Sequence, residues 1–283
     1  MKNRTLIKKI SGIDTADGDG VKLTRIIGSP QLNMLDPFLL LDCFESDQAQ
    51  DYIGGFPEHP HRGFETVTYL LNGKMRHKDN AGHEGVIESG GVQWMTAGRG
   101  ILHSEMPEQE DGLLQGFQLW VNLPRVAKMS APKYQEYSSE VLPIESLDNG
   151  GTVKVIAGVT NQGTVGPVKN NYVFPLYMDI DLPKHSGFEQ AIIQGHNAFI
   201  YVLEGSISIR GVSNNSEQTL SVKTLGILSD GENLTLQSKS EDSRFLLLAG
   251  KPLNEPVARG GPFVMNSESE IRQAFFDYQR GLF

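Results

Sequence analysis

The 283-residue chain has very little cysteine and no long apolar segment. Cys43 is its only cysteine, so no disulfide can form within the chain, and the sequence fits a reducing compartment. No stretch approaches the roughly 18 apolar residues of a membrane span, and the first residues, MKNRTLIKKISG, lack the apolar run of a signal peptide. We therefore expect a cytoplasmic protein with no membrane contact.

Positive charge is also scarce. The chain carries 25 Lys and Arg against 34 Asp and Glu, which gives a formal net charge of -9. Direct binding of nucleic acid needs a basic surface that displaces counterions from the phosphates. The composition therefore argues against direct nucleic-acid binding, and any role in gene regulation would act through a protein partner.

Helical patterns are rare, and short strand-like segments with turns replace them. Residues 64–71 are dense in β-branched and aromatic side chains, and Asn72-Gly73 follows as a hairpin signal. Glycines recur between Gly82 and Gly100 among further short segments of this kind. These features predict an all-β fold.

The C-terminal residues are the exception. Ser267 and Glu270 form an S-x-x-E capping box, and Gly281 stands where a helix would stop. Between them lies an apolar stripe with helical spacing, made of Ile271, Ala274, Phe275 and Tyr278. We predict a C-terminal α-helix whose stripe docks on the β structure.

Histidine is concentrated in one stretch, since five of the seven histidines fall between His59 and Glu105. His59 and His61 flank Pro60, which favours an extended chain, so both imidazoles point to the same face. His103 and Glu105 repeat this i, i+2 spacing. If the two segments lie on neighbouring strands, three imidazoles and one carboxylate converge, which predicts a metal site.

The donor set narrows the metal but leaves alternatives open. Nitrogen and oxygen donors without thiolate suit Fe(II), Mn(II), Ni(II), Cu(II) or catalytic Zn(II), and we favour iron. Glu65 stands four residues after His61 on the same predicted strand face and competes with Glu105 for the fourth position. We interpret His77 and His83 as exposed or backbone-bonded loop histidines, with a supporting role at the metal left open.

A weak internal repeat divides the chain into halves. Residues 198–205 (AFIYVLEG) match residues 66–73 (TVTYLLNG) at an offset of 132. The segment 124–150 contains proline and charge without a clean period. We therefore predict two similar β domains, at residues 1–135 and 145–283.

The repeat also predicts that the two domains differ in function. Under the offset, His59, His61 and Glu65 correspond to Ala191, Ile193 and Asn197. An apolar interior at these positions could not hold a divalent cation against the cost of its desolvation. We expect one metal in the first domain and none in the second, which would supply the docking surface for the C-terminal helix.

Several motifs resemble those of the pirin family of the cupin superfamily. They are HPHRGFETVTYLL, QWMTAGRGILHSEMP, FQLWVNLP and GPFVMN, and the resemblance runs from about residue 20 to the C-terminal helix. It implies two tandem jelly-roll β-barrels that face each other, of which only the N-terminal one binds a metal, generally iron. The ligands it implies are His59, His61, His103 and Glu105, so it favours Glu105 over Glu65.

The resemblance implies two classes of function. Some bacterial pirins resemble quercetin 2,3-dioxygenases, which open a flavonol ring with O2, and others are metal-dependent regulators that bind a transcription factor or a metabolic enzyme. We expect one Fe(II) per monomeric chain, a small aromatic or flavonol substrate, and Glu105 as ligand or general base. The pocket would be lined by Phe56, Trp94 and Met95. A non-enzymatic regulator that binds a protein partner remains the alternative.

Overall fold

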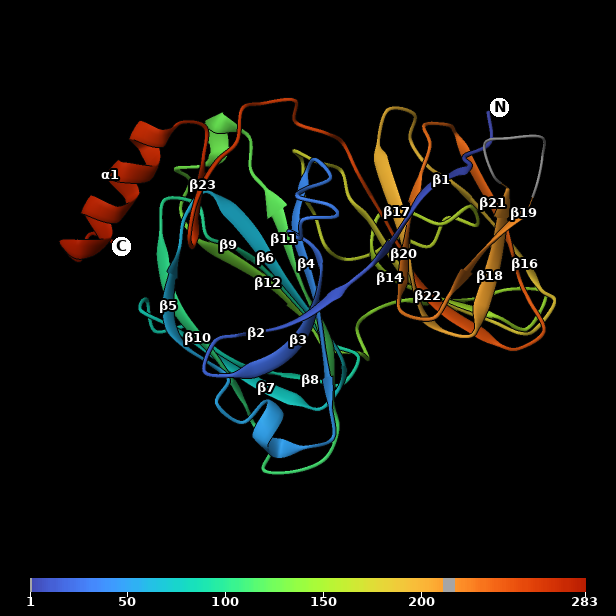
Figure 1. Cartoon of the computed structure of the whole chain (residues 1–283), viewed down its shortest axis with the longest axis horizontal. Coiled ribbons are helices and arrows are strands. Elements are labelled where there is room, and N and C mark those ends of the chain that lie inside the picture. The colour runs from blue at the N-terminus through green and yellow to red at the C-terminus, as the bar shows by residue number, and fades with distance from the viewer. Residues whose placement is uncertain (1, 211–216) are drawn as a thin grey trace. The chain divides into compact units, whose positions relative to one another are not determined.

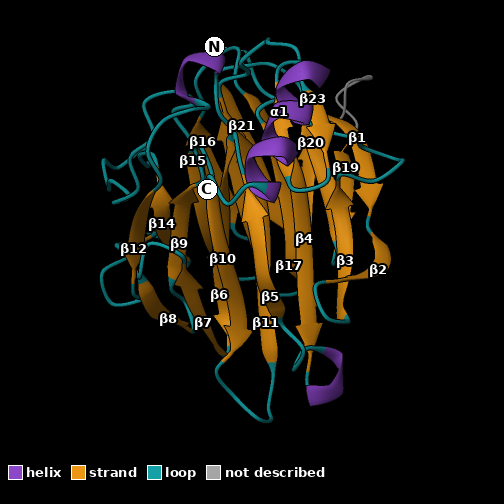
Figure 2. Ribbon diagram, turned by 90° about the vertical axis from the view of Figure 1, so that its left-hand side faces the viewer, coloured by secondary structure: helices purple, strands orange, loops and turns teal. Residues whose placement is uncertain are grey.

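The protein, seen in a computed structural model that describes residues 2–210 and 217–283, is mostly β with one C-terminal helix (Figures 1 and 2). The predicted fold class is therefore confirmed. The chain forms two compact units, and each unit draws on two separate parts of the sequence. The N-terminal unit comprises Ile13–Ser139 and Leu253–Phe283, and the C-terminal unit comprises the chain up to Gly12 and Glu140–Pro252.

The N-terminal unit contains a seven-stranded and a four-stranded antiparallel sheet. The larger sheet has the order β12 (Lys133–Tyr137), β9 (Val92–Thr96), β6 (Phe64–Asn72), β11 (Leu114–Asn122), β4 (Phe38–Ser46), β3 (Val21–Ile27) and β2 (Ile13–Asp17). The smaller sheet has the order β5 (Phe56–His61), β10 (Ile101–Pro107), β7 (Lys74–Asp79) and β8 (Glu84–Glu88). Two short 3-10 helices, η1 (Ala49–Asp51) and η2 (Arg125–Ala127), lie in its loops.

The C-terminal unit has the same two-sheet plan. Its larger sheet has the order β1 (Leu6–Ser11), β20 (Thr224–Leu228), β17 (Asn197–Glu204), β22 (Ser243–Gly250), β15 (Leu176–Leu182), β14 (Thr152–Ala157) and β13 (Ile144–Ser146). Its smaller sheet has the order β16 (Gly187–Ala191), β21 (Asn233–Ser238), β18 (Ser206–Arg210) and β19 (Glu217–Ser221). Buried aliphatic side chains from both sheets form one core between them.

The two units match strand for strand, as the internal repeat predicts. β6 and β17, which carry the repeated sequence, take the same third place in the seven-stranded sheets, and β5 and β16 take the same edge of the four-stranded sheets. The match extends to the first edge strand of each larger sheet. That place is taken by β12 in the N-terminal unit and by β1, from the start of the chain, in the C-terminal unit.

The C-terminal segment belongs to the N-terminal unit, which differs from the predicted division of the chain. Its residues form the two-stranded sheet of β23 (Ala258–Gly260) and β24 (Phe263–Met265), followed by helix α1 (Glu268–Gln279). The buried Lys128 side chain holds β24 in place, because its Nζ donates hydrogen bonds to Val264 O, Gly63 O and Asn122 Oδ1. The segment up to Gly12 therefore belongs to the C-terminal unit, and the segment from Leu253 onward belongs to the N-terminal unit.

Helix α1 begins as its sequence predicts. The Ser267 hydroxyl accepts a hydrogen bond from Glu270 N at 3.3 Å, and the Glu270 carboxylate accepts one from Asn266 N at 2.9 Å. Ile271 and Ala274 are buried against β23 and β24, whereas Phe275 and Tyr278 stay 39% and 38% exposed.

The docking surface of α1 falls within the predicted residues 145–283, but it does not belong to the second barrel. The helix packs on β23 and β24, which are part of the N-terminal unit. Arg62 anchors it as well, through an ion pair with Asp277 at 2.7 Å. Among the described residues, no helix combines the length and the apolar character that crossing a membrane requires.

Candidate metal centre

His59 and His61 project together from β5. Pro60 lies between them and keeps the chain extended, so the two rings share a face and their Nε2 atoms are 3.0 Å apart. Two nitrogen ligands at about 2.1 Å from one metal ion, at a right angle, would also lie about 3.0 Å apart. The spacing of this pair therefore fits two adjacent ligands of one ion.

His103 joins the pair from the neighbouring strand. In the antiparallel ladder of β10 and β5, His103 stands directly opposite His59, and the two ring centroids are 4.5 Å apart. The centroid of His61 lies 5.0 Å from that of His103. One ring nitrogen from each histidine lies within 4.8 Å of the other two, so the predicted convergence of three imidazoles is found.

The ring nitrogens of this group are poorly satisfied by the protein itself. Both ring nitrogens of His103 and Nδ1 of His61 are buried without a hydrogen-bond partner. A buried polar atom without a partner costs about 1 to 3 kcal/mol, so a bound ion would remove a real penalty. The donor set of neutral nitrogens suits a first-row transition metal.

The electrostatics favour neutral rings. Burial, followed by repulsion from the neighbouring imidazoles, lowers the pKa of His61 and of His103 well below the ordinary value of 6.5. Only the neutral form of an imidazole offers a lone pair to a metal. These two histidines are thus ready to bind a cation at neutral pH without first losing a proton.

Glu105 lies on the same strand but is held differently. The alternation of buried and half-buried residues along β10 places Ile101, His103 and Glu105 on one face. The Glu105 carboxylate accepts hydrogen bonds from Thr68 Oγ1 at 2.6 Å and from Gln118 Nε2 at 2.7 Å. It does not join the group of three nitrogens, so its place as fourth ligand remains a prediction.

Glu65, the competing carboxylate, forms hydrogen bonds within the larger sheet. Its oxygens accept hydrogen bonds from Thr96 Oγ1 at 2.7 Å and Trp94 Nε1 at 2.9 Å. The prediction placed it on the strand face of His61, but β5 ends at His61 and Gly63, with φ of 90°, turns the chain before β6 begins. The alternation of faces is interrupted there, and Glu65 supports the barrel wall.

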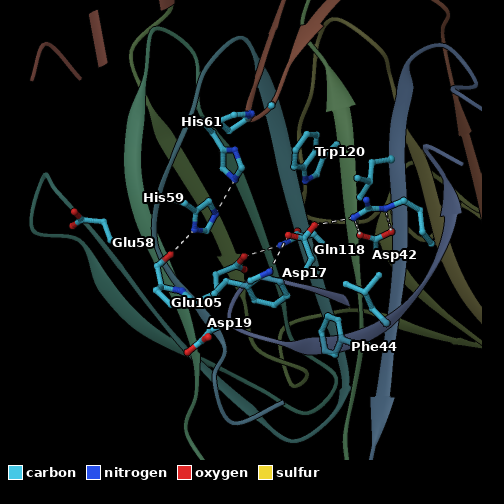
Figure 3. Close-up of a pocket in the computed structure, with 18 of the residues that line it drawn as sticks. Asp17, Asp19, Asp42, Phe44, Glu58, His59, His61, Glu105, Gln118 and Trp120 are labelled. Atoms are coloured by element: carbon cyan, nitrogen blue, oxygen red, sulfur yellow. Dashed lines mark hydrogen bonds and ion pairs between the residues drawn. The ribbon is translucent and has the colours of Figure 1, made fainter. Parts of the chain in front are cut away.

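A cavity of about 720 Å³ opens beside His59, His61 and Glu105 (Figure 3). Its apolar lining includes Leu40, Phe44, Phe56 and Trp120, and its polar lining includes Arg25, Asp42, Gln118 and Arg259. Of the three pocket residues predicted, Phe56 lines the cavity. Trp94 and Met95 do not appear among the described residues of its wall, because they are buried in β9.

Two features of the site escape sequence reasoning. The first is the C-terminal segment, which supplies Arg259, Gly261 and Pro262 to the cavity wall. These residues follow the other lining residues by more than a hundred positions in the sequence. The second is His77, interpreted from the sequence as an exposed or backbone-bonded loop histidine, with a supporting role at the metal left open. It lies buried in β7, and the alternation of Met75, His77 and Asp79 along that strand is the signal that could have identified its inward direction.

The C-terminal unit offers no comparable donors at the equivalent positions. Ala191 and Ile193 replace His59 and His61, and the ladder partner of Ala191, in the place of His103, is Asn233. Leu236 lies opposite Phe188, in the place of Glu105, and both are buried in the apolar core. Within the described residues, the groups of side chains that could hold a metal ion all lie in the N-terminal unit.

Comparison with known proteins decides the family. The family model described as Pirin matches residues 20–121, and the one described as Pirin C-terminal cupin domain matches residues 177–283. The chain belongs to the pirin family. The predicted resemblance to this family of two-cupin proteins is thereby confirmed.

Individual pirins align with the whole chain. A pirin-like protein of Caulobacter vibrioides is 52% identical over 100% of both chains. A Pseudomonas aeruginosa protein provisionally named a quercetin 2,3-dioxygenase is 45% identical, over 99% of this chain and 98% of that protein.

Solved structures show the same fold. A quercetin 2,3-dioxygenase from Acinetobacter baumannii superposes with a TM-score of 0.88 at 36% identity, covering 100% of this chain and 99% of that chain. A bacterial pirin from Escherichia coli, solved in complex with nickel(II), superposes with a TM-score of 0.66 at 21% identity, covering 87% of this chain and 98% of that chain.

Proposed function

We propose that this pirin is an iron-dependent dioxygenase that opens the ring of flavonols such as quercetin with O2. His59, His61, His103 and Glu105 would hold one Fe(II) ion. The observation that carries the proposal is the group of three imidazoles with unsatisfied nitrogens beside a cavity of about 720 Å³. The names of the relatives from Pseudomonas aeruginosa and Acinetobacter baumannii support the reaction class.

The cavity suits a flat aromatic substrate. Its volume falls within the range of about 300 to 1,000 Å³ typical of small-molecule sites. Leu40, Phe44 and Trp120 provide apolar walls for aromatic rings, and Trp120 also packs edge-on against His61, with centroids 5.3 Å apart. These walls would orient an aromatic ring next to the metal ligands.

A bound Fe(II) ion would supply a Lewis acid that lowers the pKa of a coordinated hydroxyl and a redox partner for O2. Three neutral imidazoles and one carboxylate leave a site charge of +1, which favours an anionic ligand. Glu105 would accept the proton of the substrate hydroxyl, and its place in the wall of the same cavity supports this role. Thr68 and Gln118 hold its two oxygens in place.

The test combines metal analysis with turnover. Protein purified without chelator should contain one iron per chain, and quercetin should lose its absorbance together with uptake of O2. His61→Ala should lose metal and both signals. His185→Asn, which changes an exposed histidine with φ of 61° in the other unit to a residue that tolerates this backbone, is the matched control and should keep them.

The contrary result is equally clear. Iron-replete protein that neither consumes O2 nor bleaches quercetin would reject the dioxygenase proposal. Full iron content in His61→Ala would reject the metal site itself. The first result, with the metal retained, would leave the role of a metal-dependent regulator that binds a protein partner.

A further inference from the structure

A second group of metal-type ligands lies in the same unit and shares no residue with the three histidines described above. It consists of His77 on β7, His83 in the turn before β8, and Glu136 on β12. The Oε1 atom of Glu136 lies 2.6 Å from Nε2 of His77 and 3.4 Å from Nε2 of His83. Three ligand atoms from three separate elements thus meet at one point.

Three of the imidazole nitrogens in this group lack an aligned hydrogen bond. Nδ1 and Nε2 of His77, which is 1% exposed, and Nε2 of His83 are buried without a hydrogen bond. The short contact between His77 and Glu136 brings the atoms together without hydrogen-bond alignment. The two unsatisfied ring nitrogens of the buried His77 are a second sign that this group of side chains could hold a cation.

The surroundings hold the three ligands in place. The Asp79 carboxylate accepts a hydrogen bond from His83 N at 2.8 Å, which fixes the turn, and another from Tyr134 Oη at 2.9 Å. The ring of Tyr134 packs against His83 in a tilted arrangement, with centroids 4.3 Å apart. Gln93 Nε2 donates to Glu136 Oε1 at 2.6 Å.

Space is suitable as well. Gly85 lies opposite His77 in the ladder, and a Cβ there would come within 2.6 Å of His77 Nε2. The missing side chain therefore leaves room beside this nitrogen.

We propose that His77, His83 and Glu136 form a second divalent metal site, of the two-histidine, one-carboxylate type that binds Zn²⁺. This donor set leaves at least one coordination position to water or a ligand. The side chains of His83 and Glu136 are 41% and 32% exposed, which gives an ion a path to the site.

The site would connect the two sheets of the N-terminal unit. His77 comes from the four-stranded sheet, whereas Glu136 comes from β12 at the edge of the seven-stranded sheet. A shared ion would tie the edge strand to the hairpin of β7 and β8. The site also adjoins the first centre through the ladder, where His77 stands opposite Glu105.

The experiment is a zinc titration of full-length protein from which metal has been stripped. Bound zinc is counted by mass spectrometry after desalting, and affinities are measured by calorimetry. Wild type should bind two Zn²⁺, and His83→Ala and Glu136→Gln should each bind one, with at least about a 100-fold loss of affinity at the altered site. The control His185→Asn should keep both, and unfolding curves of the stripped variants check that each one folds.

His59→Ala separates this proposal from the proposed function. It should also bind one zinc, and the double variant His59→Ala/His83→Ala should bind none. A single zinc that is lost with His83→Ala would support the second site and count against the first. Two zincs in both His83→Ala and Glu136→Gln, or a single zinc lost only with His59→Ala, would overturn the second site and leave a network of imidazoles and carboxylates only.

Discussion

The tautomer of His59 depends on a single contact. Its Nδ1 lies 2.8 Å from the carbonyl oxygen of Pro57, which can only accept a hydrogen bond. In the neutral ring the proton therefore sits on Nδ1, and the lone pair is left on Nε2, the atom that faces His61. The residue two positions earlier in the same strand thus prepares the donor atom.

The two buried glutamates should respond differently to loss of charge. Glu105→Gln removes a carboxylate beside the three histidines and should lower the iron content and affinity, because a neutral amide binds the cation less well. Glu65→Gln should leave the iron content unchanged but cost roughly 1 to 3 kcal/mol of stability, because Glu65 accepts hydrogen bonds from Trp94 and Thr96. Metal analysis and thermal unfolding of both variants provide the measurement.

The reverse pattern, with iron lost in Glu65→Gln and kept in Glu105→Gln, would show that Glu65 is the ligand.

Sequence spacing alone leaves the two glutamates as alternative ligands, and the reason is physical. The fixed alternation of faces in an extended strand identifies the histidine pairs, but it does not reveal that Gly63 turns the chain between His61 and Glu65.

At the scale of elements, the docking of α1 rests on charge as well as on apolar packing. Arg62, next to His61, is 4% exposed and pairs with Asp277 of the helix. The same arginine lies 4.3 Å from the centroid of the Phe283 ring. One buried guanidinium therefore holds both the last helix and the last residue of the chain.

A hydrogen bond from Arg62, and to a smaller extent one from Gln273, lowers the pKa of Asp277 below its ordinary value of 3.8. The unfolded chain therefore takes up the proton first as the pH falls, so the stabilisation is present above about pH 4 and is lost below it. Asp277→Asn should be less stable than wild type at neutral pH, and the difference should shrink in acid. Thermal unfolding at a series of pH values measures this.

Asp148→Asn, which changes an exposed aspartate of the other unit, is the matched control and should show little difference at any pH. A difference in stability between wild type and Asp277→Asn that stays constant down to acid pH would contradict the ion pair.

The capping box made the helix itself predictable. The surface on which it packs was not predictable, because periodicity identifies the buried face of a helix but not the residues that cover it.

At the scale of the whole molecule, the internal repeat predicted two similar folds, and the sheets agree strand for strand. The repeat could not show which unit each end of the chain completes. That depends on contacts distant in sequence, such as β1 pairing with β20 and Lys128 bonding to Val264. Local patterns do not encode such pairings.

Arg4 offers a test of this assignment. It is 1% exposed and donates hydrogen bonds to the carbonyl oxygens of Ile193, His196 and Ser229, all in the C-terminal unit. Arg4→Ala should therefore destabilise that unit by roughly 2 to 4 kcal/mol, because buried acceptors lose their donor. Iron content should not change, which metal analysis beside thermal unfolding would establish; a loss of iron with unchanged stability would contradict the assignment.

The pairing of segments distant in sequence also sets an order for biosynthesis. β1 is translated long before its partner strand β20, which ends at Leu228. The strands that carry the histidines are complete by Pro107, whereas Arg259, Gly261 and Pro262 of the cavity wall are translated much later. A nascent chain can therefore expose metal ligands long before it can close the cavity around them.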